Sequence, residues 1–88
     1  MDAFALIAER FELRKYKAAC NAPGCAEPPT VEAQVTETAG FQTRQLAALF
    51  LCNAHVLLAT ELVGGLRAQA GESIIGLKEL AFGRLPGA

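Results

Sequence analysis

The three cysteines of this 88-residue chain and its single histidine form two close pairs. Cys20 and Cys25 flank Asn-Ala-Pro-Gly, and Cys52 is followed three positions later by His55. Proline fixes φ and glycine permits a tight backbone, so the first pair brackets a turn. Residues three apart share a face of a helix, which brings the second pair together. Three thiolates and one imidazole suit tetrahedral Zn²⁺, so these four residues predict one metal site.

The ligand set predicts a structural metal and no enzyme. Four protein ligands close the coordination shell, whereas a catalytic metal keeps a position open. The chain has no second histidine, and it lacks the His-x-Glu and Pro-Cys-x-x-Cys signatures of zinc deaminases. Iron remains an alternative to zinc, although the spacing of known iron–sulfur families does not occur. A Cys20–Cys25 disulfide is also open, but it would leave Cys52 unpaired.

Size and composition favour one small domain that leaves some apolar surface exposed. We expect a single zinc-binding domain over 1–88, with its metal-bearing core over about 12–70. A chain this short is marginally stable without a staple, and a structural zinc site contributes on the order of 10–16 kcal/mol. Its composition is 52% hydrophobic, more than one small core can hide, so a partner or a second copy is expected to cover the rest.

Charge and segment patterns exclude other classes. A net charge of -1 argues against an obligate electrostatic nucleic-acid binder. No apolar run reaches the length of a membrane span, so no membrane partner is expected. The N-terminus lacks the basic region of a signal peptide. Together with an odd number of cysteines, this predicts a cytoplasmic protein.

Hydrophobic periodicity predicts an α+β fold. Apolar and polar residues alternate over 30–37, which indicates a half-buried strand, and Gly40 supports a hairpin turn. The run 45–51 is expected to be the return strand, with a helix as the competing interpretation. The main helix is expected from about Asn53 to Leu66 or beyond, ending before Gly71. Three segments complete the prediction: 4–11 as helix or strand, 12–17 as a strand, and 73–85 as strand or helix.

This order resembles the treble-clef group of zinc fingers. Cys20 and Cys25 match the knuckle, and Cys52 and His55 match the ligand pair at the helix start. The resemblance covers Cys20 to about Gln69 and concerns architecture, not one family. Its knuckle departs from the group, which commonly has two residues between the first ligands where this chain has four. The resemblance implies metal binding and little more, because treble clefs serve ribosomal proteins, nucleases, ubiquitin-related domains and transcription factors.

Two functional hypotheses follow. The first is a non-enzymatic protein–protein interaction module, similar to small accessory or inhibitor proteins of bacteria and phages. Its simplest form is a homodimer through Leu57, Val63, Ile74 and Ile75. The alternative is a nucleic-acid-binding zinc finger that uses the only positive cluster, Arg14, Lys15, Tyr16 and Lys17, with Arg44 or Arg67 if folding brings them near. The structural interpretation of that cluster is that it lies on an edge strand, where its lysines prevent aggregation.

Overall fold

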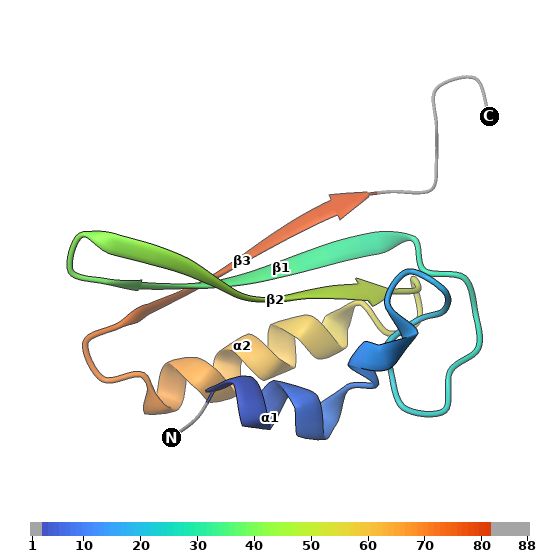
Figure 1. Ribbon diagram of the computed structural model, residues 1–88, viewed down its shortest axis with the longest axis horizontal. Coiled ribbons are helices and arrows are strands. Elements are labelled where there is room, and N and C mark those ends of the chain that lie inside the picture. The colour runs from blue at the N-terminus through green and yellow to red at the C-terminus, as the bar shows by residue number, and fades with distance from the viewer. Residues whose placement is uncertain (1–2, 82–88) are drawn as a thin grey trace.

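Two helices cover one face of a three-stranded antiparallel sheet in the computed structural model, which describes residues 3–81 (Figure 1). This arrangement is the α+β class that the sequence predicts. Along the chain the elements are α1 (Ala3–Arg10), the 3₁₀ turn η1 (Leu13–Lys15), β1 (Val31–Ala39), β2 (Gln42–Leu51), α2 (Leu57–Gln69) and β3 (Ile74–Ala81).

The sheet is built on the predicted hairpin. Its strand order is β2-β1-β3, so the alternating segment forms the central strand. Ala39 pairs with Gln42 across a two-residue turn, in which Gly40 adopts φ +62°. The register shifts after Val35, and Leu46 is the extra residue that β2 carries there. Both predicted strands of the hairpin are confirmed, and the helical alternative for 45–51 is excluded.

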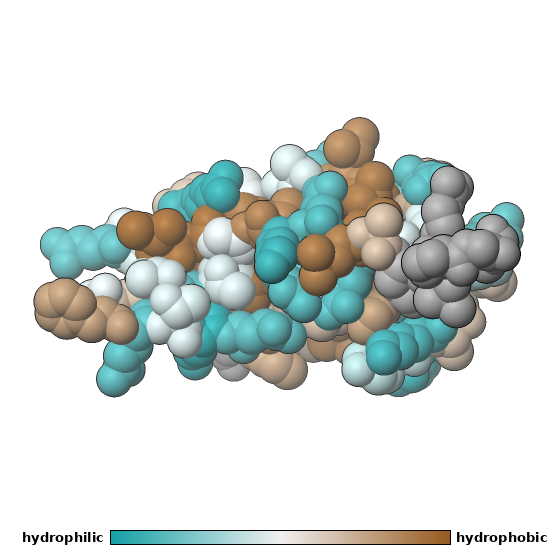
Figure 2. All heavy atoms as spheres, turned by 90° about the horizontal axis from the view of Figure 1, so that it is seen from above, coloured by the Kyte–Doolittle hydropathy of each residue, from teal (hydrophilic) through white to brown (hydrophobic). Residues whose placement is uncertain are grey.

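The hydrophobic core lies between the sheet and the helices. Ile7 and Phe11 enter it from the N-terminal segment, and α2 contributes a buried stripe. The opposite face of the sheet carries no described helix, and hydrophobic and polar residues are interspersed on it (Figure 2). No helix among residues 3–81 has the length and apolar composition to cross a membrane. The core residues of α2 and the sheet include Ala33, Val35, Leu49, Leu51, Ala59, Leu62, Val63, Leu66 and Ile75.

The predicted strand over 12–17 is wrong. The chain forms a 3₁₀ turn there, in which the Lys15 N–H donates to the Glu12 carbonyl and the Tyr16 N–H donates to the Leu13 carbonyl. The open question over 4–11 resolves as helix α1. Asp2, whose side chain is of a type suited to cap this helix, lies outside the described residues.

The predicted start of the main helix is wrong, and its predicted end is confirmed. Its first residue is Leu57 and not Asn53, because residues 53–56 form a turn that carries His55. Asn53 does not cap the helix: its Oδ1 accepts a hydrogen bond from Thr30 Oγ1 at 2.8 Å. The predicted stop is confirmed, since Gly71 follows the helix with φ +62°.

The C-terminal segment is a strand. It pairs with β1 in antiparallel orientation. Thr36 faces Gly76 in this pairing, and a Cβ on Gly76 would lie 2.8 Å from Thr36 Oγ1. A glycine at this position therefore lets β3 approach the central strand. The predicted segment continues over 82–85, which lies outside the described residues.

Candidate metal centre

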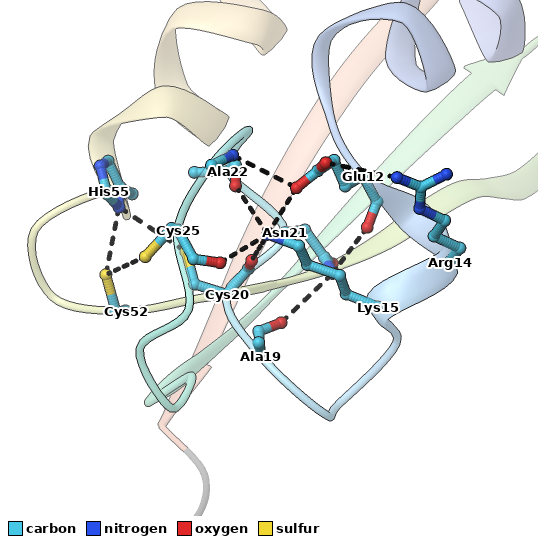
Figure 3. A network of polar contacts seen from close by, with 11 residues as sticks. Glu12, Arg14, Lys15, Ala19, Cys20, Asn21, Ala22, Cys25, Cys52 and His55 are labelled. Carbon is cyan, nitrogen blue, oxygen red and sulfur yellow. Dashed lines mark hydrogen bonds and ion pairs between the residues drawn. The ribbon is translucent and has the colours of Figure 1, made fainter.

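The structure brings the donor atoms of all four predicted ligands together. The three sulfurs and a histidine ring nitrogen lie within 4.8 Å of one another. His55 Nδ1 is 3.2 Å from Cys52 Sγ and 3.7 Å from Cys20 Sγ. Cys25 Sγ is 3.9 Å from Cys52 Sγ, and all three cysteines are free, so the Cys20–Cys25 disulfide is not formed. Figure 3 shows these side chains converging from the knuckle and from the turn before α2.

These separations fit a tetrahedral metal site. Zinc binds sulfur at about 2.3 Å and histidine nitrogen at about 2.0–2.1 Å, so a tetrahedral site has S–S edges of about 3.8 Å and S–N edges of about 3.6 Å. The 3.9 Å and 3.7 Å separations are close to those edges, the 3.2 Å separation of Cys52 Sγ from His55 Nδ1 is shorter, and the whole group lies within 4.8 Å. The four side chains are therefore arranged to bind a metal ion and are compatible with zinc.

Comparisons with protein-family models, curated proteins and solved structures found no match. What the centre does must therefore follow from its own residues.

The thiols differ in how readily they ionise. Burial raises the pKa of Cys20, although N–H groups of Ala22 and Cys52 point at its sulfur and act in the opposite direction. Burial also acts to raise the pKa of Cys52, but hydrogen bonds from His55 and from the Ala54 N–H outweigh it and lower the value to about 7. Cys52 is thus more easily converted than Cys20 to the thiolate that a metal requires.

The first ligand pair, Cys20 and Cys25, and the four residues between them form a closed turn, which is the knuckle (20–25). The Cys25 N–H donates to the Ala22 carbonyl at 3.1 Å, and the Cys20 N–H donates to the Glu27 carbonyl at 2.8 Å. Gly24 adopts φ +77°, a conformation that glycine accepts without strain. In the second pair, the His55 N–H donates to the Cys52 carbonyl at 3.0 Å, which turns the ring back toward the sulfurs.

Lys15 fastens the knuckle from outside. Its ammonium donates to the carbonyls of Cys20 at 3.3 Å and Ala22 at 3.2 Å, and also to that of Cys25 (Figure 3). Glu12 pairs with the same ammonium, and its carboxylate accepts a hydrogen bond from the Gly24 N–H at 3.3 Å. The hydrogen bond from Lys15, followed by that from Gly24, holds the pKa of Glu12 below its usual value. The interpretation of Lys15 as a strand-edge lysine is wrong, because no strand forms at this position. A nucleic-acid contact by the cluster stays a prediction.

Asn21 joins the knuckle to the sheet. It is 1% exposed, and its N–H donates to the Phe50 carbonyl at 2.7 Å while its Oδ1 accepts from the Phe50 N–H at 2.8 Å. Its Nδ2 donates to the Glu12 carbonyl at 3.2 Å. One side chain therefore fixes the knuckle against β2 and against the segment after α1.

The sequence analysis missed the supporting roles of Glu12, Lys15 and Asn21. The three-residue spacing of Glu12 and Lys15 is typical of a helical-turn ion pair. Asn21 follows the first ligand directly, where a side chain that hydrogen-bonds backbone groups favours a turn. These two signals were present in the sequence, but neither identifies the backbone groups that these side chains bond, and the Phe50 partner of Asn21 lies 29 positions away.

Two other residues of the positive cluster, Tyr16 and Lys17, pack near the ring of Phe50. Tyr16 meets Phe50 edge-on, with ring centroids 4.9 Å apart. The Lys17 ammonium lies 5.4 Å from the centre of the Tyr16 ring and 5.8 Å from that of Phe50. Arg14 is exposed and lies 3.7 Å from Glu12. Of the added arginines, Arg44 pairs with Glu37, and Arg67 donates to the Ile75 carbonyl.

Proposed function

We propose that this chain is a zinc-stabilised, non-enzymatic domain of treble-clef type that works by binding other protein chains. The observation that carries the metal part is the convergence of three sulfurs and one ring nitrogen at near-tetrahedral spacing. Cys20 and Cys25 would hold Zn²⁺ from the knuckle, and Cys52 and His55 would hold it from the turn before α2. Four protein donors leave no open position for a substrate, which supports a structural role.

Charge balance also supports a structural zinc. Three thiolates and one Zn²⁺ leave one net negative charge in a largely buried centre. The Lys15 ammonium donates to backbone carbonyls of Cys20 and Cys25, so a positive charge lies beside the ligands. Its contact with Glu12 keeps that charge in place.

The interaction role draws support from exposed apolar side chains. Leu57 is 71% exposed and Ile74 67% exposed, so these two proposed contact residues are available. The other two are not, because Val63 and Ile75 are buried in the core. Val63 and Ile75 are therefore removed from the proposed self-association surface, which keeps Leu57 and Ile74.

Nucleic-acid binding is the second candidate, and it is favoured by one observation. Tyr16 is 61% exposed with the Lys17 ammonium beside its ring, which is a combination suited to stacking on a base next to a phosphate. Binding to mixed-sequence DNA or RNA at about 50 mM salt, lost in Lys17→Glu, would support this candidate. Absence of binding at that ionic strength would eliminate it.

Elemental analysis of protein purified without chelators tests the metal proposal directly. We expect one zinc per chain, and loss of that zinc in Cys25→Ser and His55→Ala. Iron in place of zinc would replace the metal assignment, and protein that folds with no bound metal would refute the centre altogether.

A further inference from the structure

The free edge of β3 presents unpaired backbone groups. β3 lies at one end of the strand order, so only one of its edges pairs with β1. Arg67 Nε donates to the Ile75 carbonyl at 2.9 Å, which shows that this carbonyl points away from β1. Backbone groups alternate between the two edges of a strand, so those of Leu77 and Glu79 point outward as well. No described residue supplies hydrogen bonds to them.

The opposite edge of the sheet is less suited to pairing. The outward backbone groups of Phe50 on β2 are already occupied by Asn21. Toward the hairpin tip, 42–45 is polar and exposed. β3 instead carries apolar side chains on both faces, namely Ile74 and Leu80 on the open face and Leu77 toward the helices.

We propose that β3 pairs in antiparallel fashion with β3 of a second copy of this chain, with Leu77 opposite Leu77 on a two-fold axis. In this register Ile74 faces Leu80 of the other copy. These side chains are 67% and 37% exposed in the single chain, so pairing would cover two of its exposed large apolar groups. The inference rests on the interaction part of the proposed function and names the partner.

Neighbouring registers are disfavoured by side-chain charge. An axis through Lys78 would place two lysines directly opposite each other, and an axis through Glu79 would do the same with two glutamates. An axis through Gly76 would place Ile74 against Lys78 and leave Leu80 uncovered. Among the registers with an axis through residues 76–79, only the one through Leu77 combines apolar cross-strand pairs with no opposition of like charges.

The same register joins two unpaired charges. Glu79 lies opposite Ala33, which is buried, so its side chain is on the helix-covered side of the sheet. Across the axis it faces Ile75 of the second copy, whose carbonyl already accepts from Arg67 Nε and would accept the Glu79 N–H on its second lone pair. Within residues 3–81 neither Glu79 nor Arg67 has an ion-pair partner. The two-fold axis would place Glu79 of each copy beside Arg67 of the other and so form two ion pairs.

Sedimentation or light scattering of the metal-loaded protein, from about 1 μM to about 500 μM, tests the pairing. We expect the mass to rise from one chain to two. Glu79→Arg and Arg67→Glu should each weaken the dimer about tenfold or more, because each places like charges together. The double variant should restore it, and Glu61→Arg, an exposed charge reversal on α2, should leave it unchanged.

Two further measurements address the backbone pairing. Glu79→Pro removes an N–H that points away from β1, so it should abolish the dimer and leave the single-chain fold intact. Amide exchange at Leu77 and Glu79 should slow as concentration rises. A monomer at every concentration, or a dimer indifferent to Glu79→Pro and to the charge exchange, would overturn the pairing. Zinc content measured on the same samples separates that failure from a failure of the metal proposal.

Discussion

The Lys15 ammonium takes the place of water as donor to three backbone carbonyls around the knuckle. Carbonyls withdrawn from solvent need such a donor, and an ionised one bonds more strongly than a neutral one. Glu12 balances the charge and holds the Gly24 N–H. These contacts orient two of the four candidate ligand side chains through their backbone.

Replacing Lys15 with methionine keeps most of the length of the side chain and removes its hydrogen bonds. We expect the free energy of unfolding to fall by about 2 kcal/mol, because carbonyls are left without donors. Urea denaturation measures this change. Arg14→Met is the matched control, since that side chain is 86% exposed, and it should change stability by less than about 0.5 kcal/mol. Equal effects of the two substitutions would contradict the role given to Lys15.

Glu12 should make stability depend on pH in the acid range. Its folded-state pKa is lowered below 4.5, chiefly by Lys15, so the carboxylate stabilises the fold above about pH 4.5. That contribution is lost as the pH falls through the lowered value. Glu12→Gln should therefore be less stable than the natural chain near neutral pH, and the difference should narrow on acidification. Denaturation of both proteins in excess zinc at a series of pH values measures it, and a pH-independent difference would count against this account.

At the scale of elements, the fit between β1 and β3 depends on one small residue. A methyl group at Gly76 would approach Thr36 Oγ1 to 2.8 Å, closer than side chains normally pack. The strand itself would otherwise gain from losing a glycine, because glycine in a strand costs about 0.5–1 kcal/mol relative to alanine. Whether a substitution at Gly76 stabilises or destabilises the protein therefore depends on Thr36 of the neighbouring strand.

A double-mutant cycle on this pair tests the contact. Gly76→Ala alone should destabilise the protein by about 1 kcal/mol, whereas in a Thr36→Ala background it should be neutral or stabilising. Thermal unfolding of the four proteins gives the coupling. If Gly76→Ala has the same effect in both backgrounds, the contact does not limit how closely the strands approach.

Elements with strong local patterns were predictable, and those set by distant contacts were not. Alternation over 30–37 and Gly40 predict the hairpin because side-chain facing and turn geometry are local properties. Lys15 in the 3₁₀ turn bonds carbonyls of the knuckle, and Asn53 before α2 bonds Thr30, contacts that no local pattern indicates. The four candidate ligands stood out by residue type. Asn21 did not, because its partner Phe50 lies 29 positions away.

For the whole molecule, the candidate centre joins segments that are far apart in the chain. The knuckle, the turn before α2 and the segment after α1 meet at one end of the sheet, and the hairpin tip lies at the other (Figure 1). Structural zinc contributes on the order of 10–16 kcal/mol, which is comparable to the entire stability of a domain. We therefore expect metal binding and folding to be coupled.

Removing the metal should unfold the domain. A strong chelator, or Cys52→Ser, should abolish the cooperative thermal transition and most of the far-ultraviolet circular dichroism. Ala54→Ser, an exposed change in the same turn, should leave both intact. Unchanged dichroism and melting after verified metal loss would show that the sheet and helices stand without the centre.

The contact between Tyr16 and Phe50 also gives the molecule an optical signal of its own. The chain has one tyrosine and no tryptophan, so any near-ultraviolet tyrosine band comes from a single ring. That ring lies four positions before Cys20, and it meets the residue whose backbone Asn21 holds. Titration of metal into the stripped protein can therefore be followed without a label, through the asymmetry that this one chromophore acquires as the knuckle closes.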